Sequence, residues 1–255
     1  MTRTLFRPLG LAWHFLTVIK LSRTVHDATP AELARSMGWY PLIGLCLGIV
    51  LAIADRGLSL WLDSAVVDVL LVVVLVALTG GLHQDGLADT LDGIAGGKTA
   101  ADRLRIMKDP HIGAIGVTGL VLDMALRIAG LQALPDEMRS PVLICVPMFG
   151  RWGIVVGSWG ARYARAEGGV AAPFLAELSW RDVGLSTVLA LPIALLQVGW
   201  VPVLACSGAA ILLAWMMTRS IERLCGGITG DVLGAVNEVV EISVLLLLPI
   251  GAGYS

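Results

Sequence analysis

The sequence predicts an all-α protein: a polytopic membrane helix bundle of about seven transmembrane helices, preceded by an N-terminal interfacial helix. Of its 255 residues, 56% are hydrophobic and only 15% are charged, whereas about 25% of the residues of a soluble domain are charged. Apolar runs of the length that crosses a bilayer recur along the whole chain. Basic residues gather between alternate runs, which is typical of multi-pass membrane proteins.

The first apolar stretch, residues 5–19, is short and is interrupted by Pro8, Gly10 and His14. Basic residues flank it on both sides, a pattern typical of a helix that lies in the membrane interface. Residues 1–35 are therefore predicted to be the interfacial segment of one integral-membrane domain that covers residues 1–255. Seven later runs are predicted to cross the bilayer: residues 38–54, 65–80, 112–133, 141–161, 183–198, 200–218 and 237–253.

The distribution of basic residues predicts the orientation. With the N-terminus in the cytoplasm, all but four of the eighteen Lys and Arg residues lie in cytoplasmic segments; the exceptions are Arg56, Arg127, Arg139 and Arg151. Two acidic segments then face the cytoplasm. The net charge of −2 leaves no basic surface for nucleic acid. The sequence leaves open whether the chain forms a homo-oligomer.

The first acidic segment is residues 80–93, where Asp85, Asp89 and Asp92 are spaced i, i+4 and i+7. On a helix this spacing places all three carboxylates on one face. At an effective dielectric constant near 20, each like-charged pair about 5 Å apart costs roughly 3 kcal/mol, so a cation is needed. Mg²⁺ often bridges protein carboxylates to substrate phosphates. We therefore expect a magnesium site that holds a diphosphate; the alternative is a solvated loop whose aspartates cap helices.

Residues 98–111 continue this segment with basic side chains. Thr99 and Asp102 resemble a capping box, and the helix that they begin is predicted to run to about Asp109, before Pro110. Of the basic residues here, Lys108 and Arg105 are the first candidates to neutralise phosphate, although membrane topology alone also explains them. Asp109 is a candidate fourth metal ligand or base. His83 and His111 either hydrogen-bond phosphate or are structural.

The second acidic segment begins with Asp231, after a glycine-rich turn, and continues with Asn237, Glu238 and Glu241. A turn of this kind that enters a helix N-terminus is suited to anions; the alternative is that Asp231 only caps the helix. A carboxylate at the centre of the bilayer costs on the order of 3 kcal/mol, so Glu238 and Glu241 require partners.

Three further charged residues, Arg151, Asp123 and Arg127, fall inside predicted spans. Arg151 needs a partner, and the candidates are Glu238, Glu241 or a substrate phosphate. Asp123 and Arg127 are spaced i, i+4 on one helix, so we expect them to pair with each other as a structural feature.

Residues 80–116, GGLHQDGLADTLDGIAGGKTAADRLRIMKDPHIGAIG, resemble the signature of the cobalamin synthase family, the adenosylcobinamide-GDP ribazoletransferases. Residues 150–152, 163–168 and 226–238 support the resemblance, which extends from about residue 36 onwards. It implies a multi-pass enzyme of the bacterial inner membrane with its active site on the cytoplasmic face. This enzyme would join adenosylcobinamide-GDP to α-ribazole, or to α-ribazole 5′-phosphate, giving adenosylcobalamin or its 5′-phosphate and GMP, with Mg²⁺ as cofactor.

The resemblance also implies roles for the candidate residues. Asp89 is the preferred acceptor of the proton from the ribazole hydroxyl, and Asp85 is the second catalytic candidate. The predicted metal ligands are Asp85, Asp89, Asp92, Asp109, Asp231 and Glu238. The predicted substrate-binding residues are His83, Arg105, Lys108, Arg151, Arg165 and Asn237, where Arg151 and Arg165 would hold phosphate or corrin amides.

Three other classes of protein agree less well with the sequence. CDP-alcohol phosphotransferases also begin their motif with Asp-Gly-x-x-Ala, but here Ala88 is followed by Asp89 and the downstream pattern is missing. A transporter or cation channel would use intramembrane acids, but both acidic segments lie at one predicted face. A membrane scaffold would not explain the clustered acids.

Overall fold

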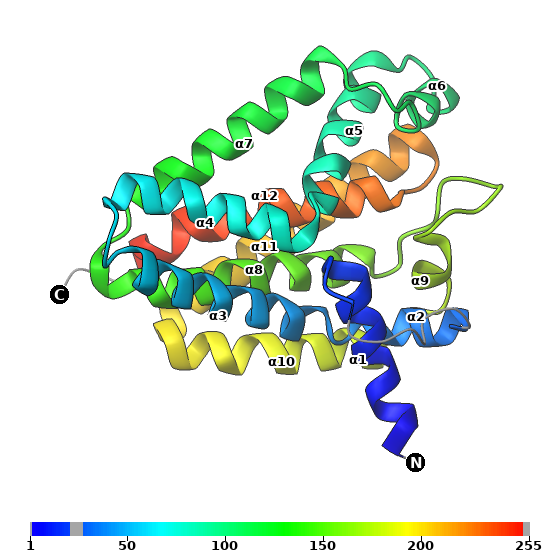
Figure 1. Cartoon of the computed structure of the whole chain (residues 1–255). Coiled ribbons are helices and arrows are strands. Elements are labelled where there is room, and N and C mark those ends of the chain that lie inside the picture. Colours follow the sequence, from blue (N-terminus) through cyan, green and yellow to red (C-terminus); the bar gives the residue numbers. More distant parts are fainter. Residues whose placement is uncertain (1, 21–27, 252–255) are drawn as a thin grey trace.

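A computed structural model describes residues 2–20 and 28–251, and every regular element in these ranges is a helix (Figure 1). The predicted all-α membrane bundle is therefore confirmed. The helices are α1 (Thr2–Leu16), α2 (Pro30–Met37), α3 (Tyr40–Leu58), α4 (Ser64–Thr79), α5 (Leu82–Gly96), α6 (Ala100–Ile106), α7 (Ala114–Gln132), α8 (Asp136–Ser158), α9 (Ala172–Ala176), α10 (Trp180–Val198), α11 (Trp200–Cys225) and α12 (Gly230–Gly251).

Six of these helices are long and apolar enough to cross a membrane: α3, α7, α8, α10, α11 and α12. A seventh span is counted when α4 and α5, which are bent by 89° relative to each other, are taken together. The bend follows from Gly80 and Gly81, whose φ angles of 66° and 70° lie in the left-handed region that favours glycine. Because α5 turns away from α4 toward α6 (Figure 1), it lies outside the predicted span of residues 65–80.

The observed helices extend beyond the predicted spans where polar residues have partners within the fold. Helix α8 begins at Asp136 rather than at residue 141, α11 continues to Cys225, and α12 begins at Gly230 rather than at residue 237. Hydropathy marks only the apolar part of a helix, whereas hydrogen bonding continues into polar residues. The Thr99–Asp102 capping box is confirmed, although its helix ends at Ile106 rather than near Asp109.

The N-terminal segment packs against the rest of the bundle. Helix α1 buries Leu11, Ala12 and Leu16, and α2 begins with a capping box at Thr29 that the sequence analysis did not predict. Arg23, one of the basic residues predicted to lie in the cytoplasm, falls outside the described residues.

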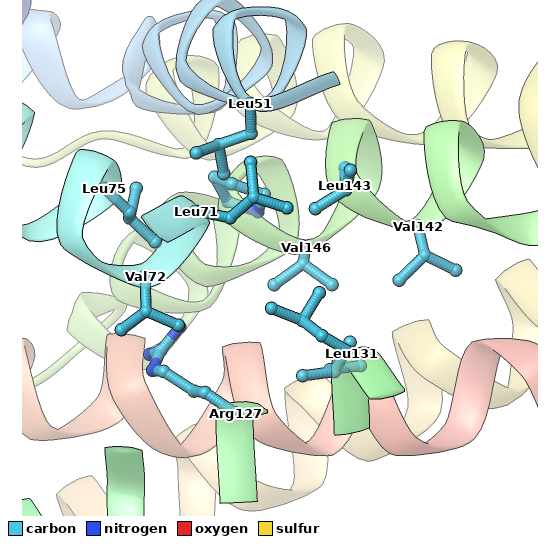
Figure 2. A pocket seen from close by; sticks show the side chains of 11 residues that line it. Leu51, Leu71, Val72, Leu75, Arg127, Leu131, Val142, Leu143 and Val146 are labelled. Atoms are coloured by element: carbon cyan, nitrogen blue, oxygen red, sulfur yellow. The ribbon is translucent and has the colours of Figure 1, made fainter. Parts of the chain in front are cut away.

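The interior of the bundle leaves little free space. A small apolar cavity of about 30 Å³ lies among Leu51, Leu71, Leu75, Val146 and Leu131 (Figure 2). Arg127 also lines it, as Figure 2 shows. A space of this size holds one or two water molecules at most. This cavity is therefore too small to bind a substrate.

Candidate active site

The two acidic segments meet where α5 crosses α12. A Cβ atom on Gly86 would lie 2.6 Å from the carbonyl oxygen of Asp231 and 3.0 Å from its Cα atom. On the other helix, a Cβ atom on Gly234 would lie 3.3 Å from the Cα atom of Gly86. The absence of side chains at these two positions allows the helix backbones to touch. The crossing brings Asp85 and Asp89 of α5 beside Asp231 of α12.

These carboxylates repel one another. Burial raises the pKa of Asp89 to about 7, and the charges of Asp85, Asp231 and Asp92 add to this effect. Asp85 is exposed, whereas Asp89 and Asp231 are half-buried. One cation is present at the cluster: Arg165 Nη2 donates to Asp231 Oδ2 at 3.1 Å. Arg165 therefore neutralises only part of the negative charge of Asp85, Asp89 and Asp231.

A short backbone bridge places Arg165 in this cluster. The loop after α8 pairs with the turn before α12, because the Ala164 amide donates to the Ile228 carbonyl at 3.0 Å and the Ile228 amide donates to the Arg162 carbonyl at 2.8 Å. The sequence analysis did not predict this pairing. No local pattern in either segment indicates it, because Ile228 alone bonds to Arg162 and Ala164, which are far away in the chain.

Asp92 uses both of its oxygen atoms to cap a helix. The amides of Gly113 and Gly116 donate to Asp92 Oδ2 and Oδ1 at 2.7 and 2.8 Å. Both amides lie at the N-terminus of α7, where they have no partner inside the helix. Asp92 thus binds α5 to α7, and a carboxylate stabilises the positive end of the helix dipole there.

Glu238, Glu241, Arg127 and Arg151 form a buried ion cluster inside the bundle. Arg127 donates to Glu238 Oε2 at 2.6 Å and to Glu241 Oε2 at 2.7 Å, while Arg151 pairs with Glu241. The predicted pair of Asp123 and Arg127 is confirmed, with Arg127 Nε 3.1 Å from Asp123 Oδ2. The predicted partners of Arg151 were Glu238, Glu241 or a substrate phosphate, and in the structure Arg151 pairs with Glu241. The sequence analysis missed the two bonds of Arg127 to α12.

Residues of α5 and α12 complete this buried ion cluster. Gln84 Nε2 donates to Glu238 Oε2 at 2.9 Å, and Asn237 Nδ2 donates to Glu238 Oε1 and Glu241 Oε1 at 2.9 and 3.0 Å. Arg151 Nη2 lies 3.3 Å from His83 Nδ1. Burial, together with the charges of Arg151 and Arg127, lowers the pKa of His83 well below its ordinary value. The structure thus brings His83, Arg151, Asn237 and Glu238 together with each other inside the bundle, where Asn237 and Glu238 lie about two turns after Asp231 on α12.

A basic cleft of about 480 Å³ lies beside the carboxylates, between α6 and residues 164–167. Arg105, Lys108 and Arg165 line it. Lys108 pairs with Glu167 at the surface, and Arg165 extends from the cleft to Asp231. Asp109 is not drawn into the carboxylate cluster: its Oδ1 atom accepts the amide of His111 at 3.0 Å, a bond that lowers the pKa of Asp109.

The donor atoms suit magnesium only if a ligand adds more oxygens. Among the described residues, no group of three or more His, Cys, Asp or Glu side chains is arranged to hold a metal ion. Mg²⁺, however, is commonly held by one or two carboxylates together with substrate phosphates and water. Asp85, Asp89 and Asp231 supply hard oxygen ligands next to the basic cleft, so the residues present fit the ion in the company of a phosphate.

Known proteins resemble the chain over nearly its whole length. The family model of cobalamin-5-phosphate synthase matches residues 8–249, a range that includes most of the N-terminal helix. An adenosylcobinamide-GDP ribazoletransferase of Desulforamulus reducens is 38% identical over 97% of this chain and 98% of its own. Enzymes of the same name from Syntrophobacter fumaroxidans and Pseudomonas fluorescens are 38% and 39% identical, over 92% and 94% of this chain and 95% and 97% of their own. No solved structure matches. The chain therefore belongs to the cobalamin-5-phosphate synthase family.

Proposed function

We propose that this protein is an adenosylcobinamide-GDP ribazoletransferase whose reaction takes place at the α5–α12 crossing. A hydroxyl group of α-ribazole, or of its 5′-phosphate, attacks the phosphorus atom joined to cobinamide. A new P–O bond forms while the bond from that phosphorus to the bridging oxygen breaks, so GMP leaves with the bridging oxygen. The products are adenosylcobalamin, or its 5′-phosphate, and GMP.

The observation that carries this proposal is an under-neutralised carboxylate cluster beside a basic cleft. The cluster of Asp85, Asp89 and Asp231 has one paired cation, Arg165. A diphosphate alone would be repelled by these carboxylates, and a divalent cation between the two removes the repulsion. When bound, Mg²⁺ would neutralise charge on the diphosphate in the transition state.

The chain's own residues divide the remaining tasks. Asp89 accepts the proton of the attacking hydroxyl, because a pKa of about 7 matches the value at which a general base works best near neutral pH. Asp85 and Asp231 would hold the cation. Arg105, Lys108 and Arg165 line the cleft that receives the phosphates, where their charges bind and orient the donor.

Arg151, Asn237 and Glu238 serve the reaction as positioning residues. Each is buried within the bundle. The bond from Gln84 to Glu238 fixes the first turn of α5 against α12, and the contact of His83 with Arg151 fixes it against α8. Asn237 holds Glu238 in place. Asp85 follows directly on that turn, so its position depends on the buried ion cluster below it.

We place the enzyme in the bacterial inner membrane with this site on the cytoplasmic face. Arg105 and Lys108 line the cleft at the site, Lys98 and Arg103 belong to the same segment, and cytoplasmic loops are the ones enriched in Lys and Arg.

The test uses purified full-length protein with adenosylcobinamide-GDP and α-ribazole. We expect GMP release that needs both substrates, stops on removal of Mg²⁺ with EDTA, and falls at least about 100-fold in D85N and D89N. A cytidylyl-activated alcohol in place of the guanylyl donor should give no product. Turnover near that of the wild type in both variants would overturn the assignment of the site.

A further inference from the structure

A second cavity, of about 220 Å³, is lined by residues of α1, α2, α3, α5, α8, α9 and α12, and most of its wall is apolar. Asp85 and Asp231 also line it, so two of the proposed catalytic carboxylates form its polar edge. A molecule bound in the cavity would therefore lie next to the reacting phosphate.

Three aromatic side chains form one wall of this cavity: Phe15, Tyr40 and Phe174. The rings of Phe15 and Tyr40 are stacked, with centroids 6.1 Å apart and an angle of 15° between their planes. The centroid of Phe174 lies 4.8 Å from that of Phe15. Tyr40 and Phe174 are buried. An apolar wall of closely packed rings favours another flat aromatic group.

The cavity also offers a hydrogen-bond donor. His83 lines it, and the Nε2 atom of His83 is buried without a hydrogen-bond partner. The other ring nitrogen, Nδ1, faces the guanidinium of Arg151 at 3.3 Å. A guanidinium can only donate, so Nδ1 is the acceptor and the proton of the neutral imidazole is on Nε2. A buried, unpaired N–H group costs stability and is suited to a ligand acceptor.

We propose that this cavity binds the base of the acceptor nucleoside, a flat and mostly apolar two-ring benzimidazole, with His83 Nε2–H donating to its free ring nitrogen. The inference rests on the proposed function. A cavity of 150 Å³ already holds benzene, so about 220 Å³ suits a fused two-ring base. Guanine fits poorly, because its several polar edge groups would lack partners against an apolar wall. The donor's guanosine therefore belongs on the side of the basic cleft.

The first experiment removes the ring of Phe174 in the full-length enzyme. We expect F174L to raise the KM for α-ribazole about tenfold, because aromatic contacts are lost, while the KM for adenosylcobinamide-GDP changes less than twofold. The matched control is F149L: Phe149 is also buried and packs on an aromatic ring, that of Trp152, but it lies in the bundle core. F149L should leave both KM values unchanged.

The second experiment tests the donor on His83. In H83N the amide oxygen replaces Nδ1 as acceptor for Arg151, and the Nε2–H group is lost. The wild type should prefer α-ribazole about tenfold over the analogue in which a C–H group replaces the free ring nitrogen, as expected for one hydrogen bond. H83N should lose this preference. The assignment of the cavity is wrong if both variants change the KM for adenosylcobinamide-GDP and not the KM for α-ribazole. It is also wrong if they change neither KM.

Binding of α-ribazole without donor, measured by equilibrium dialysis, separates the two proposals. A wild-type enzyme that releases no GMP contradicts the proposed function. The cavity is then judged by dialysis alone: binding that weakens about tenfold in F174L and not in F149L supports it, and absent or equal binding overturns it.

Discussion

At the α5–α12 crossing, burial and neighbouring carboxylates disfavour the ionised form of Asp89. Its pKa, about 7 in the folded protein, lies well above the ordinary value of 3.8. A group whose pKa is raised by folding stabilises the native state fully below its unfolded pKa, and this contribution is lost as the pH rises through the folded pKa. The metal-free protein should therefore lose stability from this group between about pH 4 and pH 7.

The variant D89N tests whether the charge of Asp89 lowers stability while it serves the reaction. An amide cannot ionise, so D89N should be more stable than the wild type at pH 8 in EDTA, with little difference at pH 4, while GMP release falls at least about 100-fold. Thermal unfolding in detergent at the two pH values measures the first effect. A D89N protein that unfolds at a lower temperature than the wild type at pH 8 would contradict the repulsion inferred here.

Asp92 should stabilise the folded protein, in contrast to ionised Asp89, because it caps α7. D92A removes the acceptor for the amides of Gly113 and Gly116 and should lower the free energy of unfolding by about 1–2 kcal/mol. The matched control is D63A: Asp63 precedes α4 but makes no side-chain capping bond, so its loss should cost no more than about 0.5 kcal/mol. Equal stability of D92A and the wild type would show that the cap is not important.

At the scale of elements, the contact of α5 with α12 decides whether a site exists. Neither helix holds enough groups alone: α5 supplies Asp85 and Asp89, and α12 supplies Asp231. Their approach depends on the missing side chains of Gly86 and Gly234.

G86A should separate the two helices, because the added methyl group meets the backbone of Asp231 rather than a flexible side chain. A displacement of about 1 Å at reacting groups is enough to slow catalysis about 100-fold, so GMP release should fall by roughly that factor. The matched control is G208A on α11, where an added Cβ has no atom within 4 Å. It should keep the wild-type rate, and a similar loss in G208A would show that the effect is not specific to the crossing.

The buried ion cluster joins α5, α7, α8 and α12, and Arg127 is its central cation. R127L leaves Asp123, Glu238 and Glu241 with only Arg151, so it should cost about 3–5 kcal/mol of stability. The control is R162L, since Arg162 is largely exposed and its pair with Glu222 is worth less than about 1 kcal/mol. Folded yield and thermal unfolding measure both variants; comparable losses in the two would contradict a central role for Arg127.

At the scale of the molecule, the two ends of the bundle differ in chemistry. The candidate site, the basic cleft and the aromatic cavity share one end. At the opposite end, Arg139 joins α8 to α3, α4 and α7 by pairing with Asp55 and Asp68, each at 2.7 Å, and by donating to the Leu131 carbonyl at 3.2 Å. Arg139 is one of the four basic residues predicted to lie outside the cytoplasmic segments, and these partners were not predicted.

The predicted orientation can be tested by labelling intact cells with an impermeant maleimide. K98C, at the site end, should react only after permeabilisation, whereas D63C, at the opposite end, should react in intact cells; both positions are exposed. The wild-type chain is the control for its four native thiols, of which Cys145, Cys206 and Cys225 are buried. The reverse pattern would place the site on the outer face.

Much of the fold could be predicted from the chain because its determinants are local. Span number and order follow from apolar length, and the pairing of Asp123 with Arg127 follows from i, i+4 spacing. Helix ends could not be predicted as well, because α8 and α12 continue through polar residues that have partners within the fold. For the site, spacing gave the shared face of Asp85 and Asp89, but it could not show that Asp92 caps α7 or that Glu238 pairs with Arg127.

By itself, the sequence determined a multi-pass helical protein with two acidic segments, since residue hydropathy and periodicity act within one helix. Only the tertiary structure decided which carboxylates face a ligand and which are neutralised inside the bundle, and that Phe15, Tyr40 and Phe174 enclose a cavity beside Asp85. The physical reason is that burial and the charge of neighbours depend on contacts between helices far apart in the chain. No periodic signal along the sequence marks the close approach of Gly86 and Gly234. The same holds for the backbone bridge that places Arg165 beside Asp231.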